Sequence, residues 1–272
     1  MVTKSALLPA SLLALSALCS ASTSTSSSSP PQQPQQNYTC PEHLYNVQIF
    51  SEDPLIIYIP SFITAEEAEH LQSISDGRFS ASQVADSSGQ QQLAKTRNSQ
   101  STSLESDRVV RCIEERALQF QGYDVKMEQL EPLQAVSYSL NQNYAPHTDW
   151  FTSATQTTAE YGGNRATSFF VYVATSEDIV GGGTQFPLLD APNNEKWCDV
   201  VNCDAGWDEG VTFRPIARNA VFWKNLKKGA KGMVGDRRTL HAGLPVQRGS
   251  KLGMNIWTRE RELDSKFRAG SA

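Results

Sequence analysis

The sequence has little positive charge and few histidines. Its 24 Lys and Arg residues are outnumbered by 29 Asp and Glu residues, which gives a formal net charge of -5. Nucleic-acid-binding proteins normally present a basic face, so we expect no nucleic-acid partner. The chain also lacks the run of ~18 apolar residues that a membrane-spanning helix needs. We therefore expect no stable membrane span if the N-terminal segment is cleaved.

The first 21 residues have the pattern of a secretory signal peptide. Lys4 supplies the positive charge, residues 6–18 form a short apolar region, and residues 19–21 form a small-residue cleavage site. The alternatives are an uncleaved signal anchor and a short buried helix. The pattern predicts entry into the secretory pathway, with the endoplasmic reticulum lumen or the exterior as destination.

Residues 22–39 are predicted to be a linker, because they consist almost entirely of Ser, Thr, Pro and Gln. Asn37 begins the sequon Asn-Tyr-Thr, which predicts an N-linked glycan just before the folded part. The length that remains suits one domain, residues 40–272, with a catalytic core at about 134–262.

The sequence has five cysteines, and removal of the signal peptide takes Cys19 away. An even number in an oxidising compartment permits two disulfides. Cys198 and Cys203 lie close together in a loop-like stretch, so we predict that they pair. Cys40 with Cys112 then follows by elimination.

Two helices are predicted in the first half of the domain. Thr64 and Glu67 form a capping box, which predicts a helix from residue 64 to about 74. Apolar residues at helical spacing predict a second helix over residues 107–119. Residues 80–103 are rich in Ser, Gln and Gly, and we interpret them as a long mobile loop.

Short apolar segments separated by turn residues predict a β structure for the rest. Beyond a strand at 55–59, they are residues 134–140, 167–175, 211–215, 219–223, 238–242 and 253–258. The predicted fold is mainly β with flanking helices: a double-stranded β-helix (a jelly roll, cupin-like) supported by the N-terminal helices.

Only four histidines are present, so each is informative. His43 lies beside the linker and His70 on the polar side of a helix, and we assign both to solvated or structural roles. His147 and Asp149 stand two apart in an extended segment, so both side chains point the same way and can reach one ion. The tripeptide alone is weak, because many chains contain it by chance.

His241 completes a set of two histidines and one carboxylate, which holds iron and leaves coordination positions open for a cosubstrate and O2. Lys251 follows ten residues later. A buried lysine in a metal pocket needs an anion, and the distal carboxylate of 2-oxoglutarate is one. The alternative for Lys251 taken alone is a surface turn.

At this point the sequence resembles the prolyl 4-hydroxylase family of 2-oxoglutarate- and Fe(II)-dependent dioxygenases, over roughly residues 55–262. The matching positions are Tyr138, Gln142, Tyr144, His147, Asp149, Arg165, residues 181–187 (Gly-Gly-Gly-Thr-Gln-Phe-Pro), residues 220–225 (Ala-Val-Phe-Trp-Lys-Asn), residues 241–246 (His-Ala-Gly-Leu-Pro-Val), Lys251, Asn255 and Trp257. Two positions depart from the family: Leu244 replaces a common Cys, and Trp150 replaces a common Tyr. An acidic, Cys-containing insertion at 189–210 is also unusual.

The resemblance implies a site for Fe(II) and 2-oxoglutarate. The catalytic set would be the metal ligands His147, Asp149 and His241 together with Lys251, and the 2-oxoglutarate-binding set Lys251, Tyr138, Thr184 and Trp257. Tyr144 and Arg165 would face the peptide. Tyr138 and Trp257 have the alternative of being plain core aromatics, and the glycine triplet that of a turn.

The implied activity is that of a procollagen-proline 4-dioxygenase-like enzyme. It would hydroxylate prolyl residues of an extended, polyproline-like peptide bound under the 80–103 loop, with O2 as cosubstrate and with hydroxyproline, succinate and CO2 as products. The resemblance also implies dependence on L-ascorbate. Two alternatives stay open: an oxygenase of the same fold that acts on another side chain or a small molecule, and an inactive secreted binding module. The sequence leaves the position of hydroxylation and the oligomeric state open.

Overall fold

The computed structural model describes Met1 and residues 38–85, 91–92, 96–192, 194–206, 209–230 and 232–268. Apart from Met1, Tyr38 and Thr39, the predicted signal peptide and linker lie outside the described residues, and so does Asn37. Among the described helices, none has the length and the apolar character to cross a membrane.

The main sheet is antiparallel and has eight strands. Their order across the sheet is β1 (Gln48–Glu52), β2 (Leu55–Ile59), β13 (Ala220–Lys224), β9 (Arg165–Thr175), β18 (Lys251–Arg259), β7 (Gln134–Tyr138), β6 (Gln100–Ser103) and β3 (Ser80–Ala81). β9 and β18 lie in the middle, and their residues are buried along most of their length.

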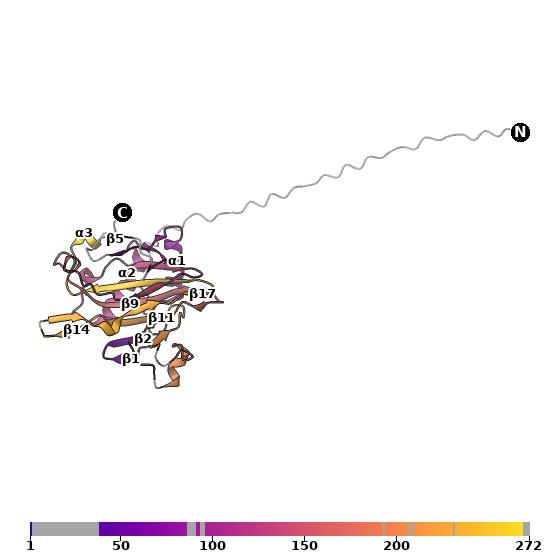
Figure 1. Ribbon diagram of the computed structural model, residues 1–272. Helices are drawn as coiled ribbons and strands as arrows, with labels where there is room; N and C mark the ends of the chain where they lie inside the picture. The colour runs from indigo at the N-terminus through magenta and orange to yellow at the C-terminus, as the bar shows by residue number, and fades with distance from the viewer. Residues whose placement is uncertain are drawn as a thin grey trace. The chain divides into compact units, whose positions relative to one another are not determined.

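A second antiparallel sheet has four strands. Their order is β12 (Val211–Phe213), β11 (Thr184–Phe186), β16 (His241–Gly243) and β8 (Tyr144–His147). Side chains alternate between the faces of a strand, so each central strand supplies two cores. In β9, Phe170 and Tyr172 pack toward the second sheet, while Phe169 and Val171 pack toward the helices. The predicted double-stranded β-helix with helices on one sheet is confirmed (Figure 1).

Two helices cover the outer face of the main sheet. α1 (Ala65–Ser75) begins at Thr64 with the predicted capping box to Glu67, and α2 (Arg108–Gln121) begins at Asp107, whose carboxylate accepts a hydrogen bond from the Val110 amide. His70 Nε2 lies 2.6 Å from Asp107 Oδ2, which links the two helices and agrees with the structural role predicted for His70.

The remaining elements are short. They are the strand pairs β4 (Val84–Ala85) with β5 (Gln91–Gln92), β10 (Val180–Gly181) with β17 (Val246–Arg248) and β14 (Leu226–Gly229) with β15 (Gly232–Gly235), the 3-10 helices η1 (Met127–Gln129), η2 (Ala154–Gln156), η3 (Glu195–Asp199) and η4 (Arg237–Thr239), and the helix α3 (Ser265–Arg268).

Two sequence predictions about local structure were wrong. Residues 80–103 are not one long loop: β3 and β6 extend the main sheet, and β4 pairs with β5. Their Ser, Gln and Thr side chains give no strand signal, because strands at or next to the edge of a sheet pair through the backbone and need no apolar face. The segment at 238–242 is not one strand either. Asp236 caps a turn of 3-10 helix before β16 begins at His241.

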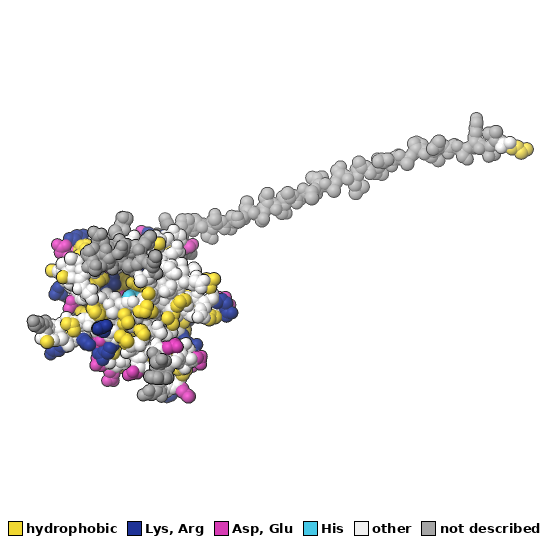
Figure 2. Space-filling model, viewed as in Figure 1, with side chains coloured by type: hydrophobic (Ala, Val, Ile, Leu, Met, Phe, Trp, Pro, Cys, Tyr) yellow, Lys and Arg dark blue, Asp and Glu magenta, His cyan; other side chains and the backbone are white. Residues whose placement is uncertain are grey.

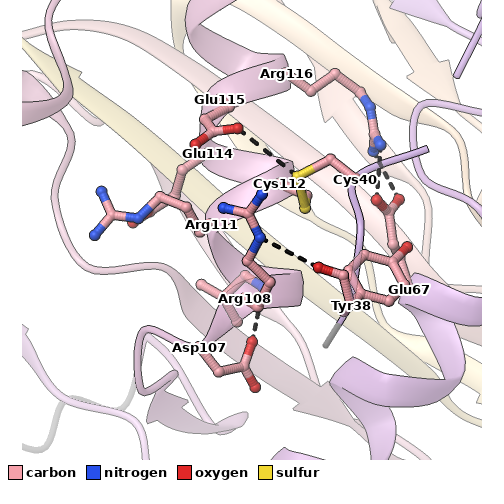
Figure 3. The surroundings of a disulfide bond; sticks show 11 residues. Tyr38, Cys40, Glu67, Asp107, Arg108, Arg111, Cys112, Glu114, Glu115 and Arg116 are labelled. Atoms are coloured by element: carbon pink, nitrogen blue, oxygen red, sulfur yellow. Dashed lines mark hydrogen bonds and ion pairs between the residues drawn. A yellow bond between two sulfur atoms is a disulfide. The ribbon is translucent and has the colours of Figure 1, made fainter. Parts of the chain in front are cut away.

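Both predicted disulfides are present. Cys40 pairs with Cys112 in α2, across 72 residues of sequence, and ties the segment before β1 to the helix layer (Figure 3). Arg108 Nε adds a hydrogen bond of 3.2 Å to the Tyr38 carbonyl in the same region. Cys198 pairs with Cys203 inside the 189–210 insertion.

Candidate active site

The second sheet brings the three predicted metal ligands together. β8 ends at His147, β16 begins at His241, and the two residues lie opposite one another in the antiparallel pair. Asp149 follows two residues after His147. Its Oδ1 lies 4.0 Å from His147 Nε2, and its Oδ2 lies 3.9 Å from His241 Nε2. One ligand atom from each residue lies within 4.8 Å of the others, which suits a single metal ion.

Backbone carbonyls orient both imidazole rings. His147 Nδ1 lies 2.9 Å from the Ala145 carbonyl oxygen, and His241 Nδ1 lies 3.0 Å from that of Thr239. A carbonyl only accepts hydrogen bonds, so each Nδ1 carries the proton. Each Nε2 is therefore left with a free lone pair about 4 Å from an oxygen of Asp149, and a neutral Nε2 is a group by which histidine binds metal.

The main sheet holds the Asp149 carboxylate through a chain of hydrogen bonds. Ser168 Oγ on β9 donates to Asp149 Oδ2 at 2.6 Å, and Asn225 Nδ2 donates to Ser168 Oγ at 2.8 Å. Trp223 Nε1 in turn donates to Asn225 Oδ1 at 2.9 Å. Sequence reasoning assigned no role to Ser168 or Asn225. Asn225 ends a block that matches the family, and that was the only signal available.

The protonation states suit metal binding. Burial, followed by the influence of His241, lowers the pKa of His147 to about 3. Burial would raise the pKa of Asp149, but His241, His147, Arg165 and the hydrogen bond from Ser168 together outweigh it and hold that pKa below its usual value. The site therefore offers a neutral imidazole and a carboxylate at neutral pH, which are the forms that ligate a metal.

A cavity opens beside these three residues. Its lining is Arg97, Tyr138, Tyr144, His147, Asp149, Phe170, Thr184, His241, Gly243, Asn255 and Trp257. Figure 2 shows a histidine, in cyan, within a hollow bordered by hydrophobic side chains. The structure thus places Tyr138, Tyr144, Thr184 and Trp257 at the cavity, where the sequence analysis expected them.

Three residues of the cavity offer groups that can contact a ligand. The Trp257 side chain is buried, yet its Nε1 has no hydrogen-bond partner among the described residues. Thr184 Oγ1 accepts a hydrogen bond of 2.7 Å from Tyr172 Oη, which leaves its own proton free to be donated. The Tyr144 ring stacks on the His147 ring with 3.5 Å between centroids. An unpaired buried donor is costly, so Trp257 indicates a missing acceptor in the cavity.

Lys251 lies next to the cavity with its charge unpaired. It is 2% exposed, and its Nζ donates to the carbonyl of Gly182 in the glycine triplet. The Nζ also lies 4.4 Å from the Tyr138 ring centroid and 5.2 Å from that of Phe170, two cavity-lining rings. No carboxylate of the described residues pairs with it, and burial lowers its pKa to about 7. A buried ammonium group of this kind fits an anionic ligand such as a dicarboxylate.

Arg165 is placed differently from the other predicted residues, because it does not line the cavity. Its guanidinium group forms two hydrogen bonds to Glu131, of 2.8 and 2.7 Å, and lies 3.6 Å from the Trp257 ring centroid. Glu131 also accepts from Arg259 Nε at 2.6 Å. Arg165 therefore packs on the Trp257 ring, and its charge lies close enough to Asp149 to lower the pKa of that carboxyl. Its contact with a peptide stays a prediction.

Sequence reasoning missed Arg97 because it lay in the segment that was interpreted as a loop. Arg97 is 8% exposed, lines the cavity, and lies 4.7 Å from the Tyr144 ring centroid. Its Nε donates to Ser99 Oγ at 3.1 Å, and one terminal nitrogen donates to Gln134 Oε1 at 3.3 Å. The pairing of β6 with β7 and an antiparallel bridge between Arg97 and Tyr144 bring these residues to the site.

Comparisons with known proteins agree with this geometry. The family described as the 2OG-Fe(II) oxygenase superfamily matches residues 133–259. Prolyl 4-hydroxylase 5 of Arabidopsis thaliana is 30% identical over 222 residues, which cover 80% of this chain and 72% of that protein. Prolyl 4-hydroxylase subunit alpha-3 of Rattus norvegicus is 31% identical over 212 residues, which cover 76% of this chain and 34% of that longer protein.

A solved structure is similar in fold. It is the viral collagen prolyl hydroxylase of Paramecium Bursaria Chlorella virus-1 in complex with 2OG, with a TM-score of 0.51 and 22% sequence identity. The similarity covers 74% of this chain and 94% of that one. At this identity the match supports the double-stranded β-helix, and the assignment of a family rests on the sequence relatives.

Proposed function

Because the chain belongs to the prolyl 4-hydroxylase family of 2-oxoglutarate- and Fe(II)-dependent oxygenases, we propose that it hydroxylates prolyl residues of extended, proline-rich peptides in the secretory pathway. Hydroxyproline, succinate and CO2 would be the products, with O2 as cosubstrate. Dependence on L-ascorbate belongs to the same proposal, by resemblance to the family. The two disulfides and the signal-like N-terminus support the secretory location.

The observation that carries the proposal is the concentration of unsatisfied polar groups around one cavity. Two imidazole nitrogens and a carboxylate lie close enough to hold one ion. Among the described residues, the ammonium group beside them has no carboxylate partner and the indole N–H has no acceptor. A fold does not bury such groups without compensation, so we infer that ligands complete them. The donor set suits Fe(II), and the ammonium group suits the distal carboxylate of 2-oxoglutarate.

Each residue of the site has a separate role in the proposed reaction. His147, Asp149 and His241 would hold Fe(II), which when bound supplies the activation of O2 coupled to decarboxylation of 2-oxoglutarate. Lys251 would neutralise the distal carboxylate, and Thr184 and Tyr138 would donate hydrogen bonds near it. The Trp257 indole N–H would donate to a cavity ligand and fix its orientation. The aromatic walls exclude water from the reacting groups.

The substrate is inferred from the shape and lining of the mouth. Tyr144 and Trp257 are aromatic, and a polyproline II chain loses little entropy when it binds such a surface. Arg97 presents a guanidinium group over Tyr144, and a proline-rich backbone offers carbonyl acceptors to it. We therefore expect a prolyl side chain to enter the cavity while its neighbours lie across the mouth.

The test is an assay with a proline-rich peptide. Purified protein is incubated with Fe(II), 2-oxoglutarate, ascorbate and the peptide, and succinate and the mass of the peptide are measured. The expected result is one added oxygen atom per modified proline, in step with succinate. A peptide with alanine at each proline serves as the control. The absence of oxygen transfer to any proline-rich peptide, with iron and 2-oxoglutarate bound, would overturn the prolyl assignment.

A further inference from the structure

Asp149 is the one residue of the predicted metal triad that lies outside the strands. β8 ends at His147 and β16 begins at His241, and these two strands pair with one another. Asp149 lies in a bend, two residues beyond the end of β8. The hydrogen bonds of a strand pair therefore fix the backbone of both histidines, whereas Asp149 has to be positioned by other contacts.

Residues at the base of the β14–β15 hairpin supply such contacts. The hairpin lies between β13 and β16 in the chain and projects from one side of the fold (Figure 1). Its outer part is exposed, but Asn225, just before β14, and Asp236, just after β15, are buried. The Asp236 amide donates a hydrogen bond of 2.8 Å to the Asn225 carbonyl oxygen. We call Asn225, Gly235 and Asp236 the hairpin base.

The first residue of the hairpin base holds the Asp149 carboxylate. Asn225 Nδ2 donates to Ser168 Oγ, and Ser168 Oγ donates to Asp149 Oδ2. The Asn225 amide also donates to the Ala166 carbonyl oxygen at 2.9 Å, which fixes Asn225 against β9. The side chains of Asn225, Ser168 and Asp149 are all buried, so water does not compete for these bonds. This end of the hairpin base therefore sets the direction in which the carboxylate points.

The other two residues of the hairpin base contact Trp150, which directly follows Asp149. Trp150 Nε1 donates to the Asp236 carbonyl oxygen at 3.2 Å. The indole ring lies against Gly235, where an added Cβ atom would be 2.1 Å from ring atom Cδ2, far inside van der Waals contact. Gly235 does not have a positive φ angle, so the ring, and not the backbone, excludes a side chain there. The tryptophan at 150, where the family commonly has tyrosine, therefore requires a glycine at 235.

Asp236 is a fixed partner for Trp150, because other residues hold it in place. The amide and the Nε of Arg238 both donate to Asp236 Oδ1 at 3.0 Å, and Lys227 Nζ lies 3.4 Å from the same oxygen. The hydrogen bond from the Arg238 side chain is the main cause that lowers the pKa of Asp236 to about 2, so these bonds are charge-assisted. Arg238 also donates to the Asp53 carbonyl oxygen at 3.1 Å, in the turn between β1 and β2.

The hairpin base is also connected to His241. Thr239 Oγ1 donates to the Asp236 carbonyl oxygen at 2.8 Å, and the Thr239 carbonyl oxygen is the partner of His241 Nδ1. One short segment, residues 225–239, thus contacts the neighbours of both Asp149 and His241. A displacement of the hairpin base would therefore alter the placement of two metal ligands relative to one another.

We propose that the hairpin base positions Asp149 for metal binding, with Trp150 and Gly235 as positioning residues. Neither residue is a ligand, and neither lines the cavity. Trp150 fills the space over Gly235 and donates to Asp236, and thereby fixes the chain directly after Asp149. The inference rests on the proposed function, because it takes the His-Asp-His triad as the iron site. Its consequence is that one added methyl group at Gly235, outside the cavity, should weaken metal binding.

The test is a titration of the whole purified protein with Mn(II), in which the electron paramagnetic resonance signal of free Mn(II) gives the affinity. Gly235→Ala adds a Cβ that displaces the Trp150 ring. Its Mn(II) affinity should fall by about 10-fold or more, because residues that orient metal ligands have effects of this size. A folded Gly235→Ala variant that binds Mn(II) as tightly as wild type would overturn the proposal.

The matched control is Gly229→Ala, in the same hairpin. Gly229 also lacks a positive φ angle, and an added Cβ would be 2.9 Å from the side chain of Val234, which is exposed and can move aside. Gly229→Ala should leave the Mn(II) affinity unchanged. Circular dichroism and urea denaturation without metal report the folded state and the stability of each variant separately. A loss of affinity as large in Gly229→Ala as in Gly235→Ala would overturn the role of the hairpin base.

A second pair of substitutions tests whether Gly235 acts through Trp150. Trp150→Ala removes the ring and should weaken Mn(II) binding by a similar factor, and Trp150→Phe, which loses only the indole N–H and part of the ring, should weaken it severalfold. In the Trp150→Ala background, Gly235→Ala has no ring to displace and should have no further effect. Factors that multiply in the double variant would overturn the proposal. So would unchanged affinity in both Trp150 variants, which decides the question even if Gly235→Ala does not fold.

These outcomes are separable from the proposed function. Wild-type protein that fails to bind Mn(II) would remove the metal site and the role of the hairpin base together. Normal Mn(II) binding and hydroxylation by wild type, with unchanged affinity in the variants, would remove the positioning role alone. Weakened Mn(II) binding in the variants, with no hydroxylation of proline by wild type, would confirm the positioning role and remove the prolyl assignment.

Discussion

The catalytic cavity and the helix layer bury charged groups to the same extent but treat them differently. In the helix layer, Glu67 and Arg116 are 0% and 6% exposed, and two hydrogen bonds of 2.7 Å join them. Arg116 also donates to the Phe62 carbonyl, and Glu67 accepts from the Thr64 amide. Beside the cavity, Lys251 is 2% exposed, and among the described residues its Nζ has a carbonyl oxygen as hydrogen-bond partner but no carboxylate. A buried charge with a partner is compensated within the fold, whereas a buried charge without one is costly until a ligand compensates it.

The largest expected effect is on the metal ligands. Replacing Asp149 with Ala removes the only carboxylate of the triad, so iron should no longer be retained and succinate formation should fall below detection. The folded state should remain, because His147 and His241 keep their hydrogen bonds to backbone carbonyls and Ser168 keeps the one from Asn225. Metal content and succinate are measured on the same sample. Iron-dependent turnover retained in this variant would contradict the assignment of the site.

The next effect concerns Lys251. Lys251→Met removes the cation proposed to bind 2-oxoglutarate, so the KM for 2-oxoglutarate should rise by about 100-fold or more. Steady-state succinate formation over a range of 2-oxoglutarate concentrations measures it. Lys228→Met, at an exposed position of β14, is the matched control and should have no effect. An unchanged KM in Lys251→Met would show that another group holds the distal carboxylate.

A substitution in the helix layer should lower the stability of the protein and leave ligand binding unchanged. Arg116→Met leaves the Glu67 carboxylate buried without its partner, so the free energy of unfolding should fall by about 3–5 kcal/mol. Iron and 2-oxoglutarate should bind the folded variant with wild-type affinity. Arg108→Met, an exposed position in the same helix, should cost less than about 1 kcal/mol. Urea denaturation monitored by circular dichroism distinguishes the two variants.

The smallest expected difference is between the two disulfides. Cys40–Cys112 spans 72 residues, and Cys198–Cys203 spans 5. Loop-closure entropy predicts that loss of the first costs about 4 kcal/mol and loss of the second about 2 kcal/mol. Paired Cys→Ala variants measured by urea denaturation test this. Equal costs would indicate that the long segment between Cys40 and Cys112 is already constrained without its bridge.

The features of the fold and of the site that depend on residue type and local spacing could be predicted from the sequence. The His147–Asp149 pair, the capping box at Thr64 and the Cys198–Cys203 disulfide follow from such patterns. Cys40–Cys112 was predicted by elimination, and His241 as the third ligand that the His147–Asp149 pair needs. The polar strand β6 was not predictable, because its pairing is through the backbone and its side chains carry no apolar pattern. The placement of Arg97 depends on that strand, and only the folded chain shows it.

The same limit applies to pairing between distant residues. The approach of Glu131 to Arg165 and Arg259, and that of Glu67 to Arg116, joins residues far apart in sequence. No local pattern distinguishes these paired charges from Lys251, which has no carboxylate partner among the described residues. Whether a buried charge has a partner, as Glu67 has, or lacks one, as Lys251 does among the described residues, is therefore decided by the tertiary fold.

The central claim is that Lys251 is a buried charge compensated by 2-oxoglutarate. Its most direct test is the free energy of unfolding of wild-type protein and of Lys251→Met, each with and without Mn(II) and 2-oxoglutarate. We expect the ligand-free variant to be at least as stable as ligand-free wild type, because an uncompensated buried charge has been removed. We also expect 2-oxoglutarate to stabilise only the wild-type protein. A ligand-free variant that is several kcal/mol less stable, or one that 2-oxoglutarate stabilises as much as wild type, would contradict the account.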